Sequence, residues 1–171
     1  MSDELSTIRQ VIEEHQGMKE HIELVTGQLN DQEAIIALEK AHSEWIPGRI
    51  EALEENREKL IQTMSLIDEG LKSHYMFEEK ILVPLMGELL AEAFINEHGE
   101  LLKEIARVKG IVANTNFKGL GRDEILSTQA AIQEAISSLH QHKEEHMAAE
   151  EAILYMIQRA LEKRRKIGVG K

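Results

Sequence analysis

The sequence contains no cysteine among its 171 residues. Disulfides, thiolate nucleophiles, zinc ribbons and cysteine-ligated iron–sulfur clusters are therefore excluded for this chain. Aromatic residues make up only 4% of the chain, and Pro47 and Pro84 are its two prolines. A composition with so few aromatics and helix breakers, and with 42% apolar residues, favours a single all-α domain over a β-sandwich.

Basic residues are fewer than acidic ones. The chain has 20 Lys and Arg and 31 Asp and Glu, which gives a formal net charge of −11. Phosphate binding needs a basic surface, so we expect no nucleic-acid partner. The basic run at 163–166 is typical of a helix C-terminus. No apolar run approaches the ~18 residues of a membrane span, and the acidic residues 1–4 do not begin a signal peptide. We expect a cytoplasmic protein without membrane association.

Apolar residues recur at alternating steps of three and four along four long segments. This spacing is typical of helix faces that pack against other helices. It predicts a four-helix bundle over residues 1–166, with an extra short helix between the first two long helices and a flexible tail at 167–171. The long helices are expected at about 2–30, 48–86, 94–112 and 123–165, the short helix at 31–46 and the clearest loop at 114–121.

Each long helix carries a histidine on its apolar stripe, and two of these histidines are followed one turn later by a glutamate on the same face. Burying an imidazole or a carboxylate without a partner costs several kcal/mol, which a metal ion between such groups would offset. Imidazoles with bridging carboxylates suit a pair of transition-metal ions. The candidate ligands are His15, His74, Glu78, His98, His146 and Glu150.

A lone histidine on an apolar face is more often a core residue, but one on each of four helices argues against coincidence. Two alternatives stay open. His142 lies one turn before His146 on the same face, and Glu151 adjoins Glu150. We expect His21 and His140 near the surface and His42 packed against the bundle, while Glu79, Glu97 and Glu145 adjoin the candidate ligands and could support them.

Four segments in this order resemble the hemerythrin-like, or HHE cation-binding, family. They are EH at 14–15, HYMFEE at 74–79 followed by Pro84, EH at 97–98, and HMAAEE at 146–151. The resemblance implies an up-down four-helix bundle that holds a non-heme diiron centre. It implies the four stripe histidines as nitrogen ligands, and Glu78 together with Glu150 (or Glu151) as bridging carboxylates.

The function that this resemblance implies is binding or sensing of O2, NO or peroxide, or sensing of iron or redox state, by two iron ions. Classical oxygen carriers of the family have a further histidine where this chain has Leu102. This departure argues against reversible oxygen carriage and could leave one coordination position open to a small ligand. The alternatives are a diiron enzyme or iron-centre repair factor, and a metal-free or zinc-stapled interaction bundle. The sequence indicates no catalytic residue and no oligomeric state.

Overall fold

The computed structural model describes residues 5–9, 37–38 and 50–168. Its regular elements are α3 (Ile50–Leu82), the 3-10 turn η1 (Val83–Leu85), α4 (Glu88–Asn114) and α5 (Arg122–Gly168). Residues 5–9 and 37–38 are also helical, and no strand occurs among the described residues. The all-α class is therefore confirmed for this part of the chain. Most of the predicted first helix and short helix lies outside the described residues.

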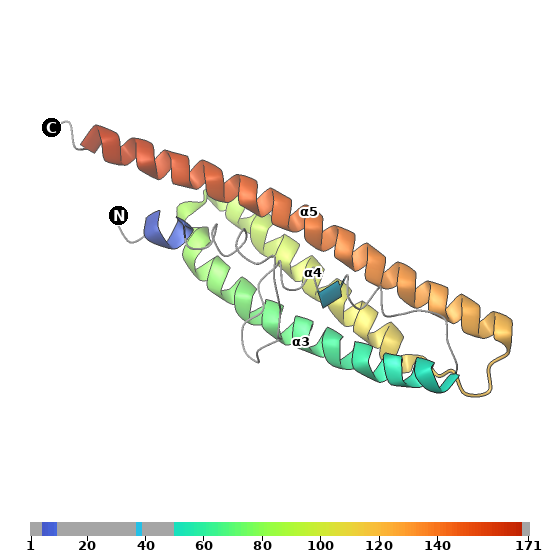
Figure 1. The fold of residues 1–171 in the computed structure, drawn as a ribbon. Coiled ribbons are helices and arrows are strands. Elements are labelled where there is room, and N and C mark those ends of the chain that lie inside the picture. Colours follow the sequence, from blue (N-terminus) through green and yellow to red (C-terminus); the bar gives the residue numbers. More distant parts are fainter. Residues whose placement is uncertain (1–4, 10–36, 39–49, 169–171) are drawn as a thin grey trace.

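Helices α3, α4 and α5 lie side by side, and consecutive helices run in opposite directions (Figure 1). Helix α4 packs against both of its neighbours in the chain. The C-terminal part of α5 extends beyond the ends of the other two (Figure 1). Within the described ranges, no helix is long and apolar enough to cross a membrane.

Prolines and glycines lie at the ends of the helices, as their backbone preferences predict. Pro84 lies in η1, immediately after α3 ends, because proline cannot continue the backbone hydrogen bonds of a helix interior. Gly87 is extended before α4, and Glu88 places an acidic side chain at the positive end of the helix dipole. In the second connection Gly119 adopts a φ of +83°, which favours glycine. Helix α5 then continues to Gly168, two residues into the predicted tail.

The buried residues form two apolar clusters at different levels of the bundle. The central cluster fills most of its length, and the end cluster lies beside η1 and the start of α4. The central cluster includes Leu60, Met64, Ile67, Leu71, Tyr75, Leu101, Ile105, Ile132, Ile136 and Leu139. The end cluster consists of Ile8, Leu82, Met86, Ala91, Phe94 and Leu154. The heptad-like spacing of these residues is what brings the three helices together.

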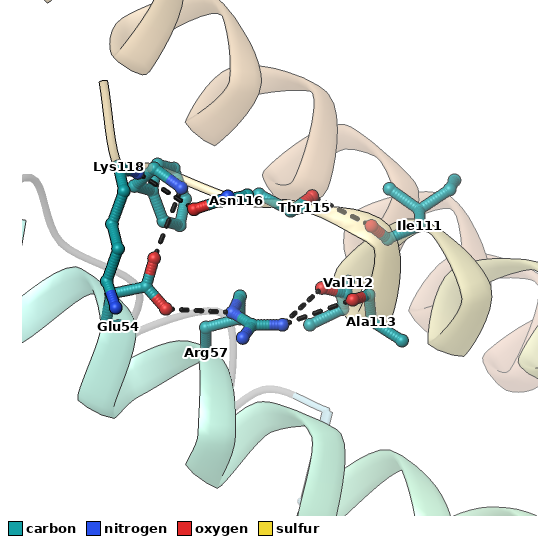
Figure 2. Close-up of polar contacts among 9 residues, drawn as sticks. Glu54, Arg57, Ile111, Val112, Ala113, Thr115, Asn116 and Lys118 are labelled. Carbon is teal, nitrogen blue, oxygen red and sulfur yellow. Dashed lines mark hydrogen bonds and ion pairs between the residues drawn. The ribbon is translucent and has the colours of Figure 1, made fainter. Parts of the chain in front are cut away.

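The end of the bundle that is farthest from η1 is closed by a polar clamp between α3 and the C-terminus of α4 (Figure 2). Arg57 Nη1 donates to the carbonyl oxygens of Ala113 at 3.2 Å and of Val112 at 3.5 Å. Glu54 accepts from Arg57 Nε at 3.3 Å and from the backbone N–H of Phe117 at 3.2 Å. The last carbonyls of a helix have no partner within the helix, so Arg57 satisfies groups that would otherwise lack one.

We predict that Arg57→Met lowers the free energy of unfolding by about 1–2 kcal/mol, because it leaves two α4 carbonyls and a half-buried Glu54 without this partner. Lys59→Met is the matched control, since Lys59 pairs with Glu55 in full solvent. Urea denaturation followed by circular dichroism measures both. Equal stabilities of the two variants would show that the clamp contributes nothing.

Candidate functional site

Five of the six predicted ligands lie among the described residues, and they meet at one level of the bundle. His74 and Glu78 come from α3, His98 from α4, and His146 and Glu150 from α5. We call these five side chains the inner polar layer. All are buried except His74, whose side chain is 10% exposed. The sixth, His15, lies outside the described residues.

Glu78 joins two of the helices within this layer. Its Oε1 lies 2.7 Å from His74 Nε2, and its Oε2 lies 3.6 Å from His98 Nε2. The His98 and His146 rings follow at a centroid distance of 5.0 Å, and His146 Nε2 lies 3.8 Å from Glu150 Oε2. The five side chains therefore form a continuous polar path across α3, α4 and α5.

Two further carboxylates approach the histidines from the outer side. Glu79 Oε1 lies 2.9 Å from His98 Nδ1, and Glu97 Oε2 lies 3.4 Å from His146 Nδ1. An ionised carboxylate only accepts hydrogen bonds, so the Nδ1 of His98 carries the proton that it shares with Glu79. This tautomer leaves the lone pair on Nε2, the nitrogen that faces Glu78. Carboxylates that hold a histidine in this way commonly orient metal-binding imidazoles.

Burial favours the neutral form of His98 and His146. It lowers the pKa of His146 to about 2, with smaller contributions from the charges of Lys143 and His98. Burial also lowers the pKa of His98, although the hydrogen bond that His98 Nδ1 donates to Glu79 partly opposes that change. A neutral imidazole is the form that binds a metal ion, so at neutral pH these nitrogens need not lose a proton before binding.

Aromatic rings flank the layer from both apolar clusters. Tyr75 of the central cluster stacks on His98, with centroids 3.9 Å apart and ring planes inclined by 9°. Phe94 of the end cluster lies 4.3 Å from the same imidazole. Tyr75 also meets His146 edge-on at 5.7 Å. The layer is therefore enclosed between two apolar regions, a setting that strengthens the electrostatic interactions inside it.

Sequence reasoning did not identify the contact between Tyr75 and Lys143. Lys143 is 1% exposed, and its Nζ donates to Tyr75 Oη at 2.6 Å. Burial lowers the pKa of Lys143 well below its usual value. A signal was present, because Leu139, Lys143 and His146 continue the alternating steps of four and three along α5. The spacing placed Lys143 on the buried face, but it could not reveal a partner on another helix.

The structure distinguishes the two alternative ligands, His142 and Glu151, from the residues of the inner polar layer. His142 pairs with Glu104 of α4 through its Nδ1 and is about one-third exposed. Glu150 is buried, whereas Glu151 is only partly buried. The geometry therefore favours Glu150 over Glu151 and gives His142 a different partner. His140, expected near the surface, keeps 21% of its side chain exposed.

A metal ion would require these side chains to move. Among the residues that the structure describes, no three His, Asp or Glu side chains are arranged to hold an ion as they stand. The direct contact between His74 Nε2 and Glu78 Oε1 illustrates the reason, since the two donor atoms would have to separate to share an ion. The chemistry of the donor set fits a transition metal, because it combines neutral imidazoles with buried carboxylates.

The fold and the site define an all-α protein with a buried His–Glu layer shared by three helices. Comparisons with protein-family models, with curated proteins and with solved structures find no match to this chain. The resemblance to hemerythrin-like proteins therefore depends on the order and spacing of the motifs, and any function that it implies is a proposal.

We predict that the metal-free protein loses stability as the pH falls below about 6.5, the ordinary pKa of histidine. Because the folded-state pKa of His98 and that of His146 are lowered, the unfolded chain takes up protons that the folded chain does not. Each such histidine contributes a loss of up to about 1.4 kcal/mol per pH unit. The contribution of His146 ends only near its folded-state pKa of about 2.

The measurement is urea denaturation of the metal-free protein between pH 7.5 and pH 5, compared with His146→Gln. This variant retains a polar side chain that does not titrate, so its stability should fall less steeply over the same range. Parallel stability curves for the two proteins would contradict the lowered pKa of His146.

Proposed function

We propose that this chain is a hemerythrin-like, up-down four-helix bundle that holds two metal ions, with iron as the first candidate. In this proposal it binds or senses a small ligand such as O2, NO or peroxide, or senses iron or redox state. The observation that carries the proposal is the convergence of His74, Glu78, His98, His146 and Glu150 from three helices into one buried layer. In addition to the donors on α3, α4 and α5, His15 on the predicted first helix would supply a nitrogen donor.

The arrangement of Glu78 supports a shared site rather than isolated histidines. Each of its two oxygens lies close to the Nε2 atom of a histidine, on α3 in one case and on α4 in the other. A carboxylate between two sets of donors suits bridging of two ions, which is a common arrangement in bundle cores. Glu150 would act in the same way from α5, next to His146. When bound, a pair of iron ions would supply reversible one-electron chemistry and affinity for diatomic ligands.

The remaining residues would prepare the donors and exclude water. Glu79 accepts a hydrogen bond from the outer nitrogen of His98, and Glu97 lies 3.4 Å from that of His146, an arrangement that would favour rings with Nε2 inward. Tyr75 and Phe94 bring aromatic surface from the two apolar clusters against His98. Surroundings of this kind would limit side reactions of a bound ion with bulk water.

We predict that His74→Ala and Glu78→Ala each remove at least one metal equivalent per chain and lower the melting temperature of the metal-loaded protein. Removing one donor costs the ion a ligand, and loss of the bound ion removes its contribution to stability. The measurement is metal content by elemental analysis after anaerobic ferrous reconstitution, together with thermal unfolding.

His142→Ala is the matched control, because it removes a histidine of α5 that contacts Glu104 rather than the inner polar layer. It should retain the metal content of the unaltered protein. Unchanged metal in both the His74 and Glu78 variants would overturn the site assignment and leave an interaction bundle as the better description.

A further inference from the structure

The Tyr75–Lys143 pair is a buried polar feature that the ligand assignment does not use. Lys143 is almost completely enclosed, and its amine meets the phenol of Tyr75 across the interface between α5 and α3. The amine also lies 4.6 Å from the centroid of the Tyr75 ring. Burying a lysine in an apolar core is costly, and a methionine of similar volume would fill the same space without that cost. Packing alone therefore does not explain why this position is a lysine.

The pair lies against the inner polar layer. Tyr75 stacks on His98 and meets His146 edge-on. On α5, Lys143 precedes His146 by three residues and Glu150 by seven, so the three side chains share one helix face. The pair is thus at the boundary between the layer and the central cluster, to which Tyr75 belongs.

Charge and hydrogen-bonding capacity indicate what the pair could recognise. A tyrosine phenol carries its proton at neutral pH, and Tyr75 Oη accepts a hydrogen bond from Lys143 Nζ, which leaves the phenol O–H available as a donor. An amine and a protonated phenol both supply hydrogen-bond donors. Donors held in an enclosed, apolar setting interact strongly with negative charge and only weakly with a neutral diatomic molecule.

We propose that Tyr75 and Lys143 determine ligand specificity at the inner polar layer by donating hydrogen bonds to a small anion bound there, such as azide or peroxide. This inference rests on the proposed function, since it needs metal ions at the layer to hold the anion. It goes beyond that function by naming the chemical class of ligand that the site prefers and the two side chains responsible.

The test uses Tyr75→Phe, Lys143→Met and the double variant, with Lys80→Met as the control. Lys80 is an exposed lysine of α3, so Lys80→Met makes the same substitution at the surface without touching the pair. Each protein is reconstituted with ferrous iron and its iron content is measured. Azide is then titrated into the oxidised protein and NO into the reduced protein, with absorption as the signal.

We expect azide affinity to fall about tenfold or more in both single variants, because each loses one charge-assisted donor. The affinity for NO should change by less than about threefold, and Lys80→Met should match the unaltered protein in both titrations. Metal-loaded variants with unchanged azide affinity would overturn this inference alone. Failure of the unaltered protein to hold iron would overturn the proposed function and this inference together.

A second measurement, on metal-free protein, separates this role from a purely structural one. Replacing both partners by apolar groups of similar size removes the buried polar pair altogether. The double variant should therefore melt at the same temperature as the unaltered metal-free protein, or at a higher one, although it has lost its preference for azide. A lower melting temperature combined with unchanged azide affinity would show that the pair only stabilises the fold.

Discussion

Burial of two carboxylates and two imidazoles at one level of a helical bundle is the constraint on which the rest of the structure depends. Glu78 and Glu150 have almost no exposure, and neither would be stable in an apolar core without polar neighbours. Those neighbours come from different helices, as when Glu78 reaches His98 of α4. The layer is therefore formed only when α3, α4 and α5 are in the correct register.

The remainder of the described structure enforces that register. Alternating steps of three and four place the central cluster along all three helices, and a shift of one helix would move its whole buried face. At one end, Arg57 and Glu54 tie α3 to the last turn of α4. At the layer itself, the stack of Tyr75 on His98 joins the same two helices, and Lys143 adds α5. Packing and polar contacts thus specify the same alignment.

The sequence predicts the parts of this arrangement that depend on local spacing. The helices, the break at Pro84 and the inward positions of Glu78 and His98 all follow from the periodicity of their own segments. Contacts between helices are not visible in that periodicity. The pairing of His142 with Glu104 is one example, because it depends on which residues α4 presents at that level.

Other features of the site depend on how each helix is rotated about its own axis, which the sequence does not specify. Glu150 and Glu151 differ by one residue, and only the orientation of α5 decides that the first is buried. Lys143 lies on the apolar stripe by spacing, yet its role depends on a tyrosine 68 residues away. The position of His15 remains a prediction, since this residue lies outside the described ranges.

Whether the inner polar layer holds a pair of iron ions is tested most directly by metal analysis of the unaltered protein, purified without added metal, together with its absorption spectrum in air. The account predicts about two irons per chain and near-ultraviolet bands of an oxo-bridged ferric pair. Zinc alone, or no metal even after anaerobic reconstitution with ferrous iron, would contradict it and would identify the layer as a structural feature of an interaction bundle.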